Sequence, residues 1–188
     1  MIRLETERLI LRDYESGDLE EYHRLQSDDE TMYYLRDIQT HSMEESKEHF
    51  SRILEDSQST NRTMYFFHME DRLTHEQIGS IGYTVTDRTP VGKLVHLGYF
   101  TYPKYWKRGY TSEALNEVLK FAFLIDDVYR ITTGCLADNI GSEMVMLKCG
   151  MVKEAVHKNY EWHDGKMRTR LEYRLLREEW IGRGETCD

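Results

Sequence analysis

The length of 188 residues suits one domain with a sizeable core, and 39% hydrophobic and 31% charged residues are typical of an ordinary soluble globular protein. The chain has 34 Asp and Glu residues against 25 Lys and Arg residues, a formal net charge of −9. This charge disfavours binding to nucleic acid or anionic membranes and would attract cationic substrates such as amines. Many soluble proteins, however, are acidic without such a role. No apolar run approaches the ~20 residues that cross a bilayer, and the N-terminal MIRLETERLILRD carries charges where a signal peptide needs an apolar block, so we expect a cytoplasmic protein.

Three elements are expected at the start of the chain. Residues 3–13 alternate between apolar and polar side chains, which predicts a strand. Residues 17–28 place apolar side chains on one face at helical spacing, which predicts a helix. Ser42 followed by Glu45 is a capping-box signature, so a second amphipathic helix is expected over residues 43–57.

Six strand-like runs and two helices are expected in the rest of the chain. The strand-like runs cover residues 63–69, 77–87, 93–100, 129–136, 152–161 and 167–176. A helix is expected from about residue 110 to 125 and a short one over residues 142–148, which Gly150 would end. The pair Asp164-Gly165 is a strong hairpin signal between the last two strands.

This order predicts the fold class and the domain organisation. A meander of antiparallel strands is followed by a βαβ connection and a final hairpin, which is typical of a mixed α/β (α+β) fold. We expect a single domain over residues 1–181 and a frayed tail over residues 182–188.

Cysteine and histidine spacing gives no indication of disulfides or of a metal site. The three cysteines, Cys135, Cys149 and Cys187, are odd in number and show no CxxC spacing. Eight histidines are scattered along the chain without the spacing of metal ligands. We interpret them as surface or hairpin residues, and they include His68, His75, His157 and His163. No metal cofactor is expected.

A basic turn before the helix expected at residue 110 is a candidate phosphate-binding site. Lys107, Arg108 and Gly109 lie where a strand leads into that helix. The first backbone N–H groups of a helix have no partner within it and carry partial positive charge, so they bind phosphate oxygens. Gly109 allows a close approach or a positive φ. A solvated turn with a glycine explains this stretch equally well, and the sequence is not that of a Walker loop.

A second stretch, Asn139-x-x-Ser142 followed by Gly150-Met151, favours the phosphate-binding interpretation of the turn over that of a solvated turn. Gly98-Tyr99 and the segment from Trp106 to Thr111 precede it in register, and the chain opens with ETERLILRDYESGD. Together these motifs resemble the GNAT superfamily, in particular the branch that contains ribosomal-protein N-terminal acetyltransferases. The resemblance covers nearly the whole chain.

The resemblance implies a GNAT-like sheet of about seven mostly antiparallel strands flanked by helices. It implies that the fourth and fifth strands, residues 93–100 and 129–136, splay apart and that coenzyme A lies between them. Backbone groups at the end of the fourth strand would pair with the pantetheine arm, the basic turn would hold the pyrophosphate, Asn139 would bind the pantetheine and Ser142 would lie near the thioester sulfur. The implied cofactor-binding residues are Phe100, Thr101, Lys107, Arg108, Gly109, Tyr110, Thr111, Ser112, Asn139 and Ser142.

The chain departs from the family pattern at four positions. Lys107 replaces a glycine and restricts the backbone, although it adds charge toward the phosphates, and Thr111 replaces a smaller residue. Met151 replaces a phenylalanine after Gly150, an apolar exchange that packing tolerates. Met146 stands where other branches carry a tyrosine as general acid, so that role would fall to Ser142 or to water.

Acyl transfer to an amine also needs a base, because only the free amine attacks. His96, two residues before Gly98, stands where many relatives carry a glutamate, and an imidazole with a pKa of about 6.5 suits general-base work near neutral pH. A purely structural hydrogen bond is the alternative reading of His96. Glu161 and Tyr160 are the next candidates, whereas Glu113 is expected to support the fold. The catalytic residues predicted are therefore His96, Ser142 and Glu161.

These observations predict an acetyl-CoA-dependent N-acetyltransferase that moves an acetyl group to a primary amine by direct attack in a ternary complex. The acceptor could be a protein N-terminus or a small amine, and relatives are often homodimers. Met146 and the histidine at position 96 motivate an alternative, a CoA-binding sensor or partner-binding protein with little or no catalysis. A true acyltransferase that uses a longer acyl-CoA is a third reading.

Overall fold

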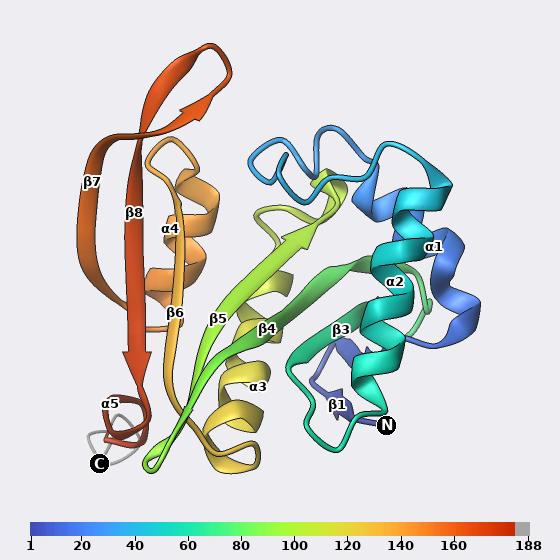
Figure 1. Cartoon of the computed structure of the whole chain (residues 1–188), viewed down its shortest axis with the longest axis horizontal. Helices are drawn as coiled ribbons and strands as arrows, with labels where there is room; N and C mark the ends of the chain where they lie inside the picture. Colours follow the sequence, from blue (N-terminus) through green and yellow to red (C-terminus); the bar gives the residue numbers. More distant parts are fainter. Residues whose placement is uncertain (183–188) are drawn as a thin grey trace. The chain divides into compact units, whose positions relative to one another are not determined.

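The computed structural model of the chain describes residues 1–182, which contain eight strands, five α-helices and two short 3₁₀-helices (Figure 1). The strands are β1 (Arg3–Glu5), β2 (Leu9–Asp13), β3 (Met64–Asp71), β4 (Gln77–Thr89), β5 (Gly92–Thr101), β6 (Val128–Leu136), β7 (Val152–His163) and β8 (Lys166–Leu176). The helices are η1 (Ser16–Asp18), α1 (Leu19–Gln26), α2 (Met43–Ser57), η2 (Pro103–Tyr105), α3 (Tyr110–Leu124), α4 (Ile140–Lys148) and α5 (Arg177–Ile181). Apart from Gly182, the tail predicted for residues 182–188 lies outside the described residues, and so does Cys187.

The strands form one mixed sheet in the order β1-β2-β3-β4-β5-β6-β8-β7. The β5–β6 ladder is parallel because helix α3 connects the two strands, whereas β1–β2, β2–β3, β3–β4, β6–β8 and β7–β8 are antiparallel. Lys93–His96 of β5 pairs with Val128–Thr132 of β6, which is the first part of each strand. The mixed α/β fold class is thus confirmed.

The predicted strand over residues 3–13 is two strands, which accounts for a sheet of eight strands instead of about seven. The chain reverses at Thr6–Arg8, where the Thr6 hydroxyl accepts a hydrogen bond from the Leu9 amide at 3.0 Å and the Thr6 amide donates to the Leu9 carbonyl at 3.0 Å. The alternation of apolar and polar residues is interrupted at this reversal by four consecutive polar residues, Glu5 to Arg8, so the sequence contained a sign of the break that the prediction of one strand passed over.

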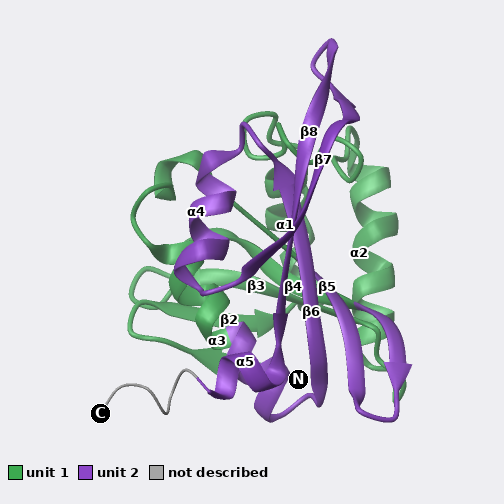
Figure 2. Ribbon diagram, turned by 90° about the vertical axis from the view of Figure 1, so that its left-hand side faces the viewer, with its two compact units in different colours: residues 1–84, 98–117 green, residues 85–97, 118–188 purple. Residues whose placement is uncertain are grey.

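Within the chain two compact units are distinguished (Figure 2). Unit 1 comprises Met1–Thr84 and Gly98–Glu117, and unit 2 comprises Val85–Leu97 and the chain from Val118 onward. In unit 1, α1 packs against α2 and α2 against β3. Aromatic and aliphatic side chains fill the space between them, namely Tyr14, Tyr22, Phe50 and Ile53. In unit 2, β8 lies between β6 and β7, and α5 packs on β6 and β8.

Local signals placed most element boundaries. The Ser42 hydroxyl accepts a hydrogen bond from the Glu45 amide at 3.2 Å and so caps α2, as the capping box predicted. Asp164 and Gly165 both have positive φ, 49° and 76°, which is the two-residue turn expected between β7 and β8. Gly150, with φ of 73°, follows α4. Helix α5, in contrast, was not predicted.

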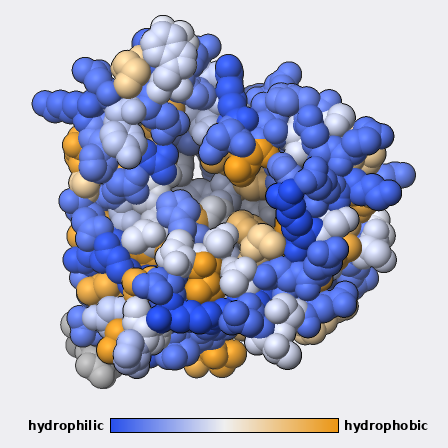
Figure 3. Space-filling model, in the orientation of Figure 1, coloured by the Kyte–Doolittle hydropathy of each residue, from blue (hydrophilic) through white to orange (hydrophobic). Residues whose placement is uncertain are grey.

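The face seen in Figure 3 is largely hydrophilic, with hydrophobic residues in small groups, in keeping with 31% charged residues. Over residues 1–182, the helices lack the combination of length and apolar character that a bilayer crossing requires. Cys135 and Cys149 are buried free thiols, as expected of small core residues.

Candidate active site

The end of β5 lies in unit 1 and is held tightly against β4. Phe100 and Thr101 are both buried, and a Cβ atom at Gly79 of β4 would lie 2.8 Å from the Thr101 Cα. The Tyr102 amide donates to the Ile78 carbonyl at 3.0 Å, and the indole nitrogen of Trp106 donates to the Thr101 carbonyl at 2.8 Å. The Thr101 carbonyl therefore already has one partner, and its second lone pair is the one that could accept from a pantetheine arm.

The predicted phosphate-binding turn follows in the same unit. Lys107 and Gly109 both have positive φ, 59° and 83°, and α3 begins at Tyr110. The positive φ of Gly109 confirms the conformation expected there. The left-handed conformation of Lys107 costs a non-glycine residue roughly 1–2 kcal/mol. A lysine at this position is therefore less favourable for the backbone than the glycine of the family pattern.

Exposure within this turn suits an anionic ligand. Trp106, Lys107, Arg108 and Gly109 are exposed, and Tyr110, Thr111 and Ser112 are half-buried. The turn thus presents two cationic side chains beside the start of a helix of 15 residues, where backbone N–H groups and the helix dipole favour phosphate.

Asn139 and Ser142 lie together at the start of α4, in unit 2. The side-chain oxygen of Asn139 accepts from the Ser142 amide at 3.2 Å and caps the helix. The side-chain NH₂ of Asn139 is therefore the group that could donate to a pantetheine carbonyl. Met146 is fully buried, so the position at which other branches carry a tyrosine is a core position here.

His96 and Glu161 belong to a polar face of the sheet in unit 2. The His96 ring nitrogen Nδ1 is 3.4 Å from the Thr132 hydroxyl on the neighbouring strand β6. Glu161 on β7 accepts from Arg170 Nη1 of β8 at 3.0 Å, and Arg170 Nε donates to Glu172 at 2.6 Å. Arg170 thus links Glu161 of β7 to Glu172 of β8, and the charges of Glu172 and Arg170 act on His96 of β5.

Glu172 was missed by sequence reasoning. Its carboxylate lies over Gly134 of β6, because a Cβ atom at Gly134 would be only 2.7 Å from Glu172 Oε2. A glycine inside the β-branched run of residues 129–136 is the signal that could have shown this close approach.

The environment of His96 favours the neutral imidazole. Partial desolvation lowers the pKa of His96, with Glu172 opposing this effect and Arg170 adding to it. A neutral imidazole can accept a proton, so the chemistry of His96 is compatible with a general base at neutral pH.

Ser142 is not on the same face as His96 and Glu161. Helix α4 contacts β8 through Tyr173, whose hydroxyl donates to Glu143 at 2.6 Å. Tyr173 and Glu172 are successive residues of β8 and point to opposite faces of the sheet. The three predicted catalytic residues are thus divided between the two faces within unit 2.

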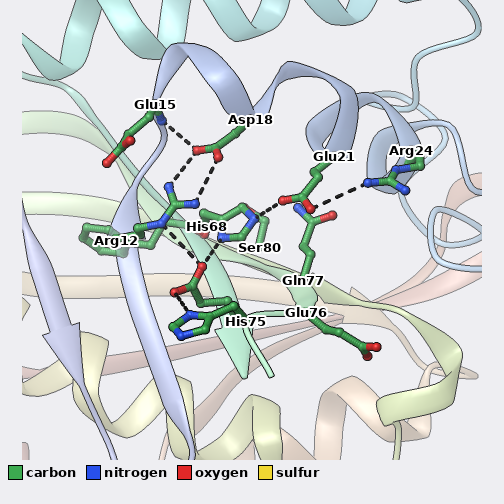
Figure 4. A network of polar contacts seen from close by, with 12 residues as sticks. Arg12, Glu15, Asp18, Glu21, Arg24, His68, His75, Glu76, Gln77 and Ser80 are labelled. Carbon is green, nitrogen blue, oxygen red and sulfur yellow. Dashed lines mark hydrogen bonds and ion pairs between the residues drawn. The ribbon is translucent and has the colours of Figure 1, made fainter. Parts of the chain in front are cut away.

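His68 corrects the interpretation of the histidines as surface or hairpin residues, because it is fully buried in unit 1. Figure 4 shows its ring between Arg12, Asp18 and Glu21. Its Nε2 is 3.0 Å from Glu21 and its Nδ1 is 3.6 Å from Glu70. Ligand atoms of Asp18, Glu21 and His68 lie within 4.8 Å of one another, a spacing that could hold a metal ion. Arg12, however, binds both Asp18 oxygens, at 2.7 and 3.0 Å. We assign no metal here because that guanidinium already supplies the cation.

Comparison with known proteins is consistent with these features. The profile of the Acetyltransferase (GNAT) domain family matches residues 8–152. The uncharacterized N-acetyltransferase YoaA of Bacillus subtilis is 28% identical over 165 residues, which cover 86% of this chain and 89% of that protein.

Two solved structures share the fold. Ribosomal-protein-S5-alanine acetyltransferase from Vibrio fischeri matches with a TM-score of 0.82 and 20% identity, over 96% of this chain and 99% of that one. Spermidine N-acetyltransferase from Vibrio cholerae, in complex with CoA and spermine, matches with a TM-score of 0.80 and 19% identity, over 94% and 99%. Since the family profile covers most of its length, the chain belongs to the GNAT family of N-acetyltransferases.

Proposed function

We propose that the protein transfers the acetyl group of acetyl-CoA to a primary amine by direct attack in a ternary complex. The observation that carries this proposal is the exposed basic turn at the start of α3, with positive φ at Lys107 and Gly109, in a chain of the GNAT family. Such a turn suits the pyrophosphate of coenzyme A because it combines helix N–H groups with cationic side chains.

The remaining cofactor contacts follow from the same assignment. Backbone groups of Phe100 and Thr101 would bind the pantetheine arm, and Asn139 would bind it through its side-chain NH₂. Arg108 to Ser112 would bind the pyrophosphate, and Lys107 would add charge. Acetyl-CoA is a cosubstrate in this scheme, and the scheme requires no metal.

His96 is the proposed general base. It would take a proton from the ammonium group of the acceptor so that the free amine can attack, while backbone donors would stabilise the negative charge that develops on the thioester oxygen. Glu161, linked to Glu172 through Arg170, is the next candidate on the same face. Ser142 or water would protonate the departing thiolate. Holding amine and thioester in line can by itself remove ~7–11 kcal/mol of barrier, so one base supplies only part of the rate enhancement.

The acceptor is proposed to be a protein N-terminus or a small amine. The two structures of similar fold are named for such acceptors, a ribosomal protein in one case and spermidine in the other. The net charge of −9 favours cationic acceptors of either kind. Membership of the ribosomal-protein branch, cytoplasmic location and a homodimer remain predictions.

Release of the CoA thiol from acetyl-CoA, measured with a thiol reagent, tests this function. The acceptor panel contains spermidine, spermine, amino sugars and short peptides with an N-terminal alanine or serine. Saturable release with one class identifies the acceptor. The buried Met146 favours the second candidate, a CoA-binding protein with little catalysis. Calorimetric binding of acetyl-CoA without turnover on the whole panel would support that candidate, and absence of both would refute a CoA-dependent function.

A further inference from the structure

Arg8, in the reversal between β1 and β2, is tied to the first turn of α3. Its Nε and Nη2 atoms lie 2.7 and 2.6 Å from Glu113 Oε2, and the Arg8 amide donates to Glu113 Oε1 at 2.9 Å. The Thr6 hydroxyl donates to the same Oε1 atom at 2.5 Å. Burial alone would raise the pKa of Glu113, but these hydrogen bonds from Thr6 and Arg8 lower it. Glu113 is therefore an ionised anchor for the Arg8 guanidinium.

The same guanidinium contacts Arg108 and Tyr110 of the proposed phosphate-binding turn and lies beside Gly109. Arg8 Nη1 donates to the Arg108 carbonyl at 3.0 Å. A Cβ atom at Gly109 would lie 3.4 Å from Arg8 Nη2. The guanidinium carbon lies 4.3 Å from the centroid of the Tyr110 ring, a distance typical of a cation–π contact.

These contacts fix the direction of a backbone donor. The peptide between Arg108 and Gly109 is trans, as are the others in the described chain, so its C=O and N–H groups point in opposite directions. Since the Arg108 carbonyl points toward Arg8, the Gly109 N–H points away from it. The hydrogen bond at 3.0 Å thus keeps that N–H free of the N-terminal hairpin and turned toward the other side of the turn.

We propose that Arg8 is a positioning residue for the pyrophosphate of coenzyme A, acting through the Arg108–Gly109 peptide. The inference rests on the proposed function and adds a residue 100 positions away from the turn. Arg8 is not proposed as a direct phosphate ligand, because Glu113 balances its charge and its three nitrogens already bind Glu113 or the Arg108 carbonyl.

The test compares a cosubstrate that contains the pyrophosphate with one that lacks it. Thiol release from acetyl-CoA and from S-acetylpantetheine is measured with Arg8→Gln and with Arg8→Lys, which keeps the charge but not the forked geometry. We expect Arg8→Gln to lower kcat/KM for acetyl-CoA about tenfold through KM, by analogy with the loss of one charge-assisted hydrogen bond. Its kcat/KM for S-acetylpantetheine should stay within about twofold of the unmodified protein, and Arg8→Lys should recover part of the loss.

Arg3→Gln is the matched control, since Arg3 lies on β1 and its ion pair within residues 1–182 is with the exposed Glu5. Circular dichroism and the thermal midpoint establish that each variant is folded. An equal loss for both cosubstrates would mean a purely structural role and would overturn the proposal, as would an unchanged KM for acetyl-CoA in Arg8→Gln. If the unmodified protein neither bound nor used acetyl-CoA, the proposed function would fail first and the positioning role would fall with it. If Arg8→Gln does not fold, the Arg8→Lys comparison decides by the same criteria.

Discussion

At the scale of single residues, the protonation state of His96 links the sheet to the proposed chemistry. Partial desolvation keeps the pKa of this exposed imidazole below its ordinary value, even though Glu172 acts in the opposite direction. The ring is therefore mainly neutral at pH 7, and a base of this kind is lost only as the pH falls below the ordinary value of about 6.5.

Replacement of His96 should accordingly reduce turnover and alter its pH dependence. We expect His96→Gln to lower kcat/KM roughly 10²-fold or more, which is the scale of general-base catalysis. The acidic limb of the kcat/KM profile, expected below pH ~6.5 in the unmodified protein, should disappear in the variant. Thiol release across a pH series measures both effects.

His41→Gln is a suitable control because His41 is an exposed residue before α2. A His96→Gln variant with unchanged kcat/KM and an unchanged acidic limb would show that His96 makes only a structural hydrogen bond. Glu172→Gln and Glu161→Gln would then be the variants to compare.

At the scale of elements, the approach of β4 to the end of β5 depends on one glycine. Gly79 lies opposite the Phe100–Thr101 backbone, and a methyl group there would meet backbone atoms that cannot rotate away. We expect Gly79→Ala to destabilise the fold by about 1–3 kcal/mol, the usual cost of overpacking. Urea unfolding at equilibrium gives this difference directly.

Gly98→Ala provides the comparison within β5, because a Cβ atom at Gly98 would meet nothing within 4 Å. That variant should retain the stability of the unmodified protein to within about 0.5 kcal/mol. Equal stability of the Gly79→Ala and Gly98→Ala proteins would contradict the close approach described for β4.

The elements also show which features a sequence can reveal. The cap of α2, the extent of α3 and the Asp164-Gly165 turn depend on neighbouring residues, and all were predicted. The reversal at Thr6–Arg8 is held in addition by Glu113, more than 100 residues away, and that contact has no local signal. The placement of Glu172 over Gly134 likewise requires the pairing of β6 with β8.

Candidate site residues were likewise found where the signal is local and missed where it depends on distant residues. The turn around Gly109 was found because a glycine between basic residues before a helix is a local signal. His68 was misread because its surroundings come from distant parts of the chain: β2 and β4 flank it in the sheet, and Glu21 of α1 contacts its ring. A single histidine in a strand carries no mark of such surroundings.

At the scale of the whole molecule, His68 makes stability depend on pH. Burial lowers the pKa of His68 in the folded state, and Arg12 adds to this, against opposing contributions from Asp18 and Glu21. The unfolded chain therefore binds a proton at a higher pH than the folded protein does. Above pH ~6.5 His68 should not reduce the free energy of unfolding. As the pH falls below that value and through the lower folded pKa of His68, the free energy of unfolding should decrease.

Urea unfolding at about pH 7.5 and about pH 5.5 checks this expectation. His68→Gln, which keeps a hydrogen-bond donor for Glu21, should show a smaller difference between the two conditions than the unmodified protein. His41→Gln, at an exposed position before α2, should show an unchanged difference. A difference that survives intact in His68→Gln would assign the acid sensitivity to other groups.

The contact between Arg8 and Glu113 also has an evolutionary consequence. Loss of one of the two side chains would leave the other as a partly buried charge without its partner. A substitution at one position should therefore favour a substitution at the other. Residues 8 and 113, which are 105 positions apart, should therefore be exchanged together or not at all among descendants of a common ancestor. Lineages that lose this pair are expected to be those in which the turn before α3 has acquired another means of holding its backbone.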